Sequence, residues 1–353
     1  MSIIRASIVG LALLALFFRL PAELVERVYS CGAYLWVQRL LTHLSNQVAF
    51  ALLDVAVAVA VGAALFLVVR FVRRVRRRPF RAAWATVASL VVGAAAIYLL
   101  FQAVWGLNYQ RVPLTEKLEY SAAPPGRAAV ARLASEAGTQ LNSLHGDAHS
   151  GRWPEWDEMI AWLGPGFYQT QRHLTGGATA LPGRPKWSVF TIYFQRAGVD
   201  GMTDPLFLEV LVNQTLLPFE RPFVVAHEWA HLAGYANEAE ANFIGWLTCL
   251  QGPVPARYSG WLFLFSHALA ALPEPDRGHA VQMLDAGPLN DLRGIQLRLS
   301  TVRPIVRAVG WDIYDRYLRA NRVDQGVRSY DRAVLLILGT RFKPGWVPVR
   351  RGE

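Results

Sequence analysis

One segment near the middle of the chain constrains the fold and the chemistry more than any other. It carries His227, Glu228 and His231 in the spacing H-E-x-x-H, within a mainly apolar stretch. Two histidines four residues apart project from one face of a helix, close enough to share a metal ion. A catalytic zinc ion takes such nitrogens at about 2.0–2.1 Å and keeps a position open for water, whose proton Glu228 can take. The spacing therefore predicts a helix with two zinc ligands and a general base.

The neighbouring residues favour a metal site over a chance match. Apolar residues 223–225 precede the first histidine, as expected at the start of a buried helix. Gly234 then offers a C-cap that lets the chain turn back. The competing interpretation is an amphipathic helix with two chance histidines, or histidines satisfied in a core. Placing two histidines and a glutamate in a buried apolar helix costs free energy, and that interpretation gives them no function.

The third ligand is expected on the next predicted helix, from Glu238 to about Leu250. Glu238 and Glu240 are two residues apart, so their side chains point about 200° apart around a helix and only one can face the metal. The segment resembles the E-x-x-A-D element that supplies the third ligand in gluzincin-type membrane peptidases. That resemblance implies Glu238 as the ligand, with Glu240 as the alternative. Asn242 then takes the place of the Asp that supports a ligating histidine.

The composition predicts membrane segments. The chain is 53% hydrophobic and has a mean hydropathy of +0.23, which is apolar for a soluble protein. Three apolar runs lie at about residues 3–18, 48–69 and 84–105. The second and third have the roughly 20 residues that a bilayer span needs. The first is short for a span and could instead be the core of a signal peptide.

The distribution of charge predicts the orientation in the membrane. The net charge is +10, and residues 70–81 contain seven arginines and no acid. A nucleic-acid partner explains this cluster poorly, whereas the positive-inside rule explains it as a cytoplasmic loop between two spans. We therefore expect a multi-pass membrane protein with a membrane domain over residues 1–105. Residues 106–353 would form a catalytic domain on the periplasmic or extracellular side.

The remaining pattern predicts a mainly α-helical fold with a small sheet just before the H-E-x-x-H helix. Residues 19–47 are predicted to form an amphipathic helix on the membrane or on the catalytic domain. Strands are expected at 188–195 and 206–213, and a helical region at 153–172 is expected to break at 164–166. Zincins share this α+β arrangement, and their edge strand pairs with extended substrate.

Nearly the whole chain resembles an uncharacterised family of bacterial membrane proteins, catalogued as a domain of unknown function. The family has three N-terminal spans and a gluzincin-like site, which implies a zinc metallopeptidase without an established substrate. The specific part of the resemblance is the segment from His227 to Phe243. The weaker parts are Trp105-Gly-Leu-Asn108-Tyr109 with Arg111 and Pro113, Pro185-Lys186, Glu209 with Asn213 and Pro218, and Ser329-Tyr330-Asp331.

Other residues carry narrower predictions. Tyr330 is a candidate for oxyanion stabilisation, because gluzincins use a Tyr or His from beyond the zinc helices; the alternative is a packed aromatic residue. Glu209 could line the cleft or face solvent. Asp54 could act inside the membrane, although placement at the interface is favoured. Cys31 and Cys249 could pair, but two free thiols are favoured.

The sequence thus predicts a membrane-anchored, zinc-dependent metallopeptidase that cleaves peptide bonds outside the cytoplasm. Its partners would be a peptide or protein substrate and the lipid bilayer, with no nucleic acid; the oligomeric state stays open. One alternative is a non-catalytic membrane protein with a structural or sensing zinc site, which predicts a fourth protein ligand. The other is a zinc amidase that acts on a cell-wall or lipid substrate.

Overall fold

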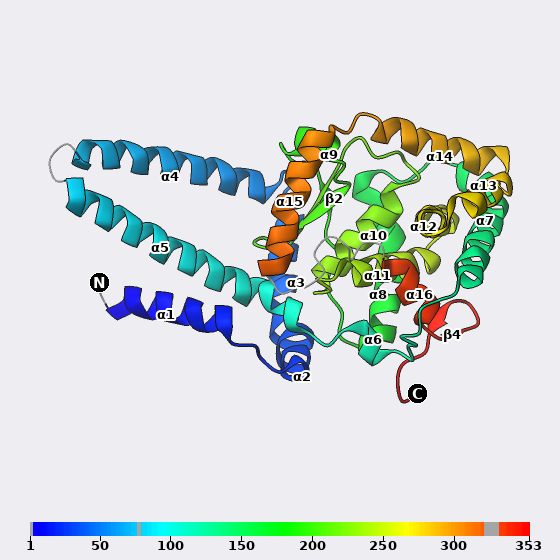
Figure 1. The fold of residues 1–353 in the computed structure, drawn as a ribbon, viewed down its shortest axis with the longest axis horizontal. Coiled ribbons are helices and arrows are strands. Elements are labelled where there is room, and N and C mark those ends of the chain that lie inside the picture. The colour runs from blue at the N-terminus through cyan, green and yellow to red at the C-terminus, as the bar shows by residue number, and fades with distance from the viewer. Residues whose placement is uncertain (1–2, 76–78, 321–331) are drawn as a thin grey trace.

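The chain divides visibly into projecting helices and a compact helical domain. The computed structural model describes residues 3–75, 79–320 and 332–353. Helices α1 (Ile3–Phe17), α4 (Leu52–Val75) and α5 (Pro79–Val104) extend together to one side of the domain, and α1 packs along α5 (Figure 1). The structure is therefore mainly helical, as predicted.

Two of these helices are long and apolar enough to cross a membrane. They supply the spans Leu52–Arg73 and Ala83–Val104, whose side chains are almost entirely exposed. Helix α1 has only 15 residues, fewer than the roughly 20 that a bilayer needs. It contributes a third crossing only if it forms one bent span with Ala22–Asn46, across a 114° bend. Membrane association therefore rests on two or three apolar helices, and the orientation stays a prediction.

The predicted amphipathic segment packs on the domain. It comprises α2 (Ala22–Leu24), the π-helical η1 (Val25–Ala33) and α3 (Tyr34–Asn46). Tyr34 and Leu35 are buried in the main hydrophobic core, together with side chains of the helical domain. This segment precedes α4 and α5 in the chain, but it packs into the core of the domain that follows them.

The domain after α5 consists of helices around one main core and two small sheets. The three-stranded sheet contains β1 (Pro185–Lys186), β2 (Gly201–Asp204) and β3 (Glu209–Val212), and the two-stranded sheet contains β4 (Phe342–Lys343) and β5 (Val347–Pro348). The helices are η2 (Gly106–Gln110), α6 (Leu114–Lys117), α7 (Arg127–His149), η3 (Trp156–Glu158), α8 (Met159–Thr175), α9 (Thr191–Ala197), α10 (Arg221–Leu232), α11 (Glu238–Leu250), α12 (Val254–Ala271), α13 (Glu274–Gln282), α14 (Ala286–Leu299), α15 (Pro304–Ala320) and α16 (Ala333–Gly339).

The three-stranded sheet confirms the prediction of a small sheet before the H-E-x-x-H helix. Its strand order is β1-β3-β2, with β1 parallel and β2 antiparallel to the central strand β3. All four residues of β3 are buried, whereas β2 lies at an edge and packs against α10. The edge strand β2 therefore lies directly against α10, the helix that carries the H-E-x-x-H segment.

Two local predictions were wrong. Residues 188–195 do not form a strand, because the chain turns at Ser188 and enters α9. The apolar residues that suggested a strand are mostly exposed on this short helix, with Phe194 buried. Helix α8 also continues through Pro165 instead of breaking. Its buried face, which includes Leu163 and Phe167, packs against α11, and this packing outweighs the helix-breaking tendency of proline.

The first turn of α4 is fastened to the sheet. Glu209 neither lines a cleft nor faces solvent: it is fully buried, and Lys186 Nζ lies 2.9 Å from its carboxylate. The same carboxylate accepts hydrogen bonds from the backbone N–H groups of Leu52 and Leu53, which are unpaired donors at the start of a helix. Asp54 accepts hydrogen bonds from Ser188 Oγ and the N–H of Val189. Glu209 thus holds the start of α4 against β3, and Asp54 holds it against the residues that follow β1.

Candidate metal centre

Helices α10 and α11 bring His227, His231 and Glu238 together as one potential metal site, here called the α10–α11 cluster. The two histidine Nε2 atoms are 3.1 Å apart, and they lie 3.3 Å and 3.5 Å from Glu238 Oε2. Ligand atoms at about 2.0–2.1 Å from a tetrahedral zinc ion would be about 3.3–3.4 Å apart. The three donor atoms therefore have the spacing of one face of a tetrahedron around zinc.

Close packing of the two helices explains why Glu238 joins the cluster. A Cβ on Gly245 would lie 3.0 Å from the backbone nitrogen of His227, so the missing side chain allows α11 to approach α10. Glu238 lies two helical turns before Gly245 and shares its face. Asn237 caps the start of α11 by accepting hydrogen bonds from the N–H groups of Ala239 and Glu240. The cap and the glycine together fix which face of α11 meets the histidines.

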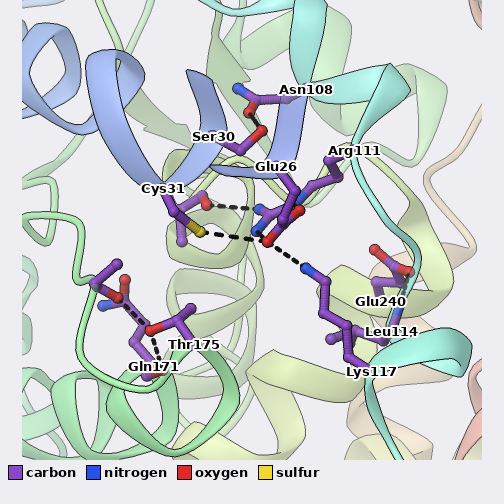
Figure 2. Close-up of polar contacts among 12 residues, drawn as sticks. Glu26, Ser30, Cys31, Asn108, Arg111, Leu114, Lys117, Gln171, Thr175 and Glu240 are labelled. Carbon is purple, nitrogen blue, oxygen red and sulfur yellow. Dashed lines mark hydrogen bonds and ion pairs between the residues drawn. The ribbon is translucent and has the colours of Figure 1, made fainter. Parts of the chain in front are cut away.

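Glu240, the alternative ligand, points elsewhere. Its carboxylate is buried and accepts a 2.6 Å hydrogen bond from the backbone N–H of Leu114, at the start of α6 (Figure 2). Burial raises the pKa of Glu240, opposed by this hydrogen bond and by Lys117. Within the described residues Glu240 is thus a structural carboxylate rather than a member of the α10–α11 cluster.

The turn after α10 orients His231. Its Nδ1 lies 2.8 Å from the backbone oxygen of Tyr235, which favours a proton on Nδ1 and leaves Nε2 free to bind a metal. Burial alone would lower the pKa of His231, but the carboxylate of Glu238 raises it to about 9. Burial likewise opposes the charge of Glu238, but the two histidines hold its pKa well below the usual range. Without a metal, the cluster is therefore a buried ion pair.

The support that Asn242 was predicted to give a ligating histidine is not formed at His227. Its Nδ1 is buried and makes no hydrogen bond with the described residues. Asn242, one turn after Glu238, likewise has a buried side-chain nitrogen without a partner in that part of the chain. The second turn of α11 therefore supplies close packing against α10 rather than a hydrogen bond to the histidine.

Glu228 lies next to the cluster, between α10 and β2. Its carboxylate is almost fully buried, and Thr203 Oγ1 on the edge strand lies 2.8 Å from Oε2. A Cβ on Gly201 would lie 2.6 Å from Oε1, so the absence of a side chain there leaves room for the carboxylate. Burial raises the pKa of Glu228, partly offset by His227 and His231. A carboxylate with a raised pKa is better matched to proton transfer near neutral pH.

Side chains from membrane-proximal segments satisfy the C-terminal carbonyl groups of α10. Trp105 Nε1 donates to the oxygen of His231, Tyr34 Oη to that of Leu232, and Arg111 to that of Ala233. The last carbonyl groups of a helix lack partners within the helix. Trp105 and Arg111, which belonged only to the weaker part of the family resemblance, thus fix the C-terminal end of α10 together with Tyr34.

The arginine in this clamp is itself held in place. Arg111 also pairs with Glu26 at 2.9 Å (Figure 2). Its guanidinium stacks 3.9 Å over the ring of Tyr235. Gly234 has a positive φ of 81°, and a Cβ there would lie 2.7 Å from Asn108 Oδ1. The turn that orients His231 is therefore packed from both sides, and only its glycine was visible in the sequence.

Three residues that carried narrower predictions remain, namely Tyr330 and the two cysteines. Tyr330 lies outside the described residues, so its role stays a prediction. Cys31 and Cys249 are free thiols, as favoured. The roles of Thr203 and Gly201 beside Glu228 were not predicted, because no strand was expected at residues 201–204.

A second group of two histidines and a carboxylate lies elsewhere in the domain: His145 and His149 on α7 with Asp291 on α14, here called the α7–α14 cluster. Asp291 Oδ2 lies 2.9 Å from His149 Nε2 and 3.7 Å from His145 Nε2. The same oxygen accepts a 2.5 Å hydrogen bond from Tyr258 Oη on α12. This oxygen therefore already has two close hydrogen-bonding partners.

Comparisons with known proteins bear on the chain as a whole. No curated protein matches the chain, and no solved structure matches it either. The match to a family spans the two apolar helices α4 and α5 and both histidine clusters. It confirms the prediction of an uncharacterised family. The chain belongs to the family described as "Protein of unknown function (DUF3810)", whose model matches residues 29–338.

Proposed function

We propose that this protein is a membrane-anchored zinc hydrolase of the gluzincin type that cleaves peptide bonds. The observation that carries the proposal is the α10–α11 cluster, whose three donor atoms have the spacing of a tetrahedral zinc site. The donor set of two imidazoles and one carboxylate is the one found in zinc peptidases of the thermolysin type. Zinc bound there would polarise the substrate carbonyl and activate water as a nucleophile.

The surrounding side chains have separate roles in this proposal. Glu228 takes the proton of the attacking water, and Thr203 holds its carboxylate toward the site. The hydrogen bond from His231 to Tyr235 fixes the imidazole in the orientation that presents Nε2. Close packing at Gly245 sets the distance between the helices that supply the ligands. Tyr330 stays a candidate for stabilising the oxyanion.

The position of β2 favours a peptide over a cell-wall or lipid amide. β2 is an edge strand, and Thr203 at its centre contacts the proposed general base. An edge strand can add an extended peptide through backbone hydrogen bonds. A peptide bound along β2 would therefore lie beside Glu228. The proposed catalytic domain is therefore zincin-like, with β2 as the substrate strand.

A purely structural zinc site is less well supported. Such sites are closed by four protein ligands, whereas catalytic sites keep a position open. In the parts of the chain that the structure describes, the cluster has three members. Glu228 beside it has no role in a closed site. The arginines of residues 70–81 support a location of this domain outside the cytoplasm.

Zinc content and hydrolysis test the proposal together. We expect about one zinc per purified chain, lost in His231→Ala and Glu238→Gln but kept in Glu240→Gln. A Glu228→Gln variant should keep its zinc and lose hydrolysis of a fluorogenic peptide library by about 10²-fold or more. Glu240→Gln is the matched control, because it changes a carboxylate two residues from the ligand.

Two results would overturn the proposal. Wild-type protein prepared without chelators could lack zinc, which would remove the metal site. Alternatively, Glu228→Gln could hydrolyse the library at the wild-type rate while retaining zinc, which would remove the proposed mechanism.

A further inference from the structure

The helical domain has one unusual surface. Among the described residues after Val104, twelve large hydrophobic side chains are exposed, and ten of them lie in residues 187–193 and 297–313. They are Trp187, Val189, Ile192, Tyr193, Leu297, Leu299, Ile305, Val309, Trp311 and Ile313. Exposed apolar side chains on a soluble face are normally scattered, so their concentration here needs a partner.

The two segments form one surface. Helix α15 packs on α9, and the N–H of Arg303 donates to the backbone oxygen of Arg196. A Cβ on Gly310 would lie 2.6 Å from Tyr193 Oη, so the helices are in close contact midway along α15. We call these exposed side chains of residues 187–193 and 297–313 the α9–α15 surface.

This surface is continuous with the end of a membrane helix. Asp54, in the first turn of α4, accepts hydrogen bonds from Ser188 and from Val189, whose side chain is 62% exposed. The apolar surface therefore starts at the level where α4 leaves the domain. In the view of Figure 1, α15 stands at the junction between the domain and the projecting helices and runs across their direction. A helix that lies in the plane of a membrane has this orientation.

The chemistry of the surface also suits a bilayer interface. Trp187, Tyr193 and Trp311 are the residue types that gather at the level of the lipid head groups. Arg303, just before α15, and Arg307 on α15 are exposed, and the Arg307 guanidinium lies 5.1 Å from the centroid of the Trp311 ring. They can therefore reach lipid phosphates beside an interfacial aromatic residue. Apolar side chains with flanking arginines and interfacial aromatics are typical of helices that lie on a membrane.

We propose that the α9–α15 surface rests in the outer interface of the bilayer and presents the metal centre to polypeptides that are anchored in the same membrane. Only three residues separate the end of α9 at Ala197 from Gly201, which lies against Glu228. The proposed substrate strand β2 therefore follows α9, one of the two proposed lipid-facing helices, almost directly in the chain. The part that concerns the substrate rests on the function proposed above; the docking itself does not.

Depth measurements test the docking without any need for activity. Single cysteines replace Ile192 or Val309 in a Cys31→Ser background and carry an environment-sensitive fluorophore; the native Cys249 is fully buried. The protein is placed in nanodiscs of phosphatidylethanolamine and phosphatidylglycerol with a doxyl-labelled lipid. We expect lipid quenching of at least about twofold at both positions. Thr139→Cys should show none, because it is an exposed position of α7, a helix that lies far from α4 and α5 in Figure 1.

The alternatives have distinct results. If the fluorophores at 192 and 309 respond only to a quencher dissolved in water, as at 139, the docking is wrong. If lipid does not quench them but they cross-link between copies, a second chain covers the surface, and the proposal also fails.

A second experiment tests the substrate class. The double variant Ile192→Asp/Val309→Asp is compared with wild type on one peptide, either free in solution or linked to a phospholipid in the nanodisc. We expect cleavage of the linked peptide to fall by about tenfold, because tethering helps only when enzyme and peptide share a surface. Cleavage of the free peptide and the zinc content should stay unchanged. An equal fall for both peptides would contradict membrane presentation, and no cleavage of either by wild type would contradict the hydrolase itself.

Discussion

The two histidine clusters have almost the same composition but different geometry. In the α10–α11 cluster the imidazole rings are nearly perpendicular, at 89°, and their Nε2 atoms converge on one point with Glu238. In the α7–α14 cluster the rings of His145 and His149 are stacked, at 24°, with centroids 4.3 Å apart. Both pairs have the spacing i, i+4, so the spacing of the histidines alone does not separate them.

Hydrogen bonds account for the difference. Asp291 in the α7–α14 cluster lies at hydrogen-bond distance from His149 and Tyr258, so its contacts are satisfied without a metal. The α10–α11 contacts of 3.3 Å and 3.5 Å are longer than a good N–H···O bond, and two ring nitrogens face each other at 3.1 Å. A proton on one of the two nitrogens, or a cation shared by both, would satisfy this contact. The comparison favours the α10–α11 cluster as the site of the proposed zinc ion, whereas the α7–α14 cluster joins three helices through hydrogen bonds.

The largest expected effect is on metal content. His231→Ala should abolish tight zinc binding, whereas His149→Ala should leave it unchanged. The donor atoms of the first cluster lie 3.1–3.5 Å apart, as a tetrahedral zinc site requires, whereas Asp291 Oδ2 lies 2.9 Å and 3.7 Å from its two histidines and is already hydrogen-bonded. Elemental analysis of both purified variants measures this directly. Equal zinc loss in the two variants would erase the distinction between the clusters.

The next effect concerns the general base, which has no counterpart in the α7–α14 cluster. Gly201→Ala should displace the Glu228 carboxylate, since the new Cβ would lie 2.6 Å from Oε1. Peptide hydrolysis should fall by about 10²-fold while zinc content stays at the wild-type level. Gly278→Ala is the matched control, because a Cβ there meets no atom within 4 Å. Normal activity in Gly201→Ala would show that the position of Glu228 is not limiting.

A stability measurement should reveal the role of the α7–α14 cluster. Tyr258→Phe removes a buried hydroxyl that donates to the Asp291 carboxylate, and such bonds to charged groups are worth about 1.5–3 kcal/mol. The unfolding free energy should fall by about that amount, with no change in zinc content. Tyr168→Phe, at a partly exposed position of α8, should change stability far less. If Tyr258→Phe lost zinc instead, this cluster would also be a metal site.

The smallest effect is the pH dependence of the metal-free protein. The folded-state pKa of His231, about 9, exceeds its ordinary value of about 6.5, so its charge stabilises the fold below pH ~6.5 and this contribution is lost as the pH rises through about 9. Glu238, with a lowered pKa, contributes above its ordinary value of about 4.3. The melting temperature of chelator-treated protein should therefore decline between pH ~6.5 and ~9.

Glu238→Gln supplies the control for this pH profile, since it removes the carboxylate that raises the pKa of His231. Its melting temperature should vary less over the same range. An unchanged decline in that variant would assign the pH dependence to other groups.

Local patterns predicted the elements that depend on composition and periodicity. The apolar runs became α4 and α5, and the H-E-x-x-H segment became α10 with both histidines on one face. The pattern failed at residues 188–195, where the apolar residues lie on α9 or just before it and most are exposed near the start of α4. A short run of apolar residues does not by itself distinguish a half-buried strand from a short helix with an exposed apolar side.

The sequence by itself determined the chemistry of the site: the two imidazoles, the adjacent carboxylate and the two candidate glutamates all lie within fourteen residues, 227–240. Only the tertiary structure decided which glutamate faces the histidines, because that depends on the approach of α11 to α10 at Gly245. It also decided that Glu209 fastens the first turn of α4 and that Thr203 holds Glu228. Side-chain identity is local, whereas partners distant in the chain are chosen by packing between elements.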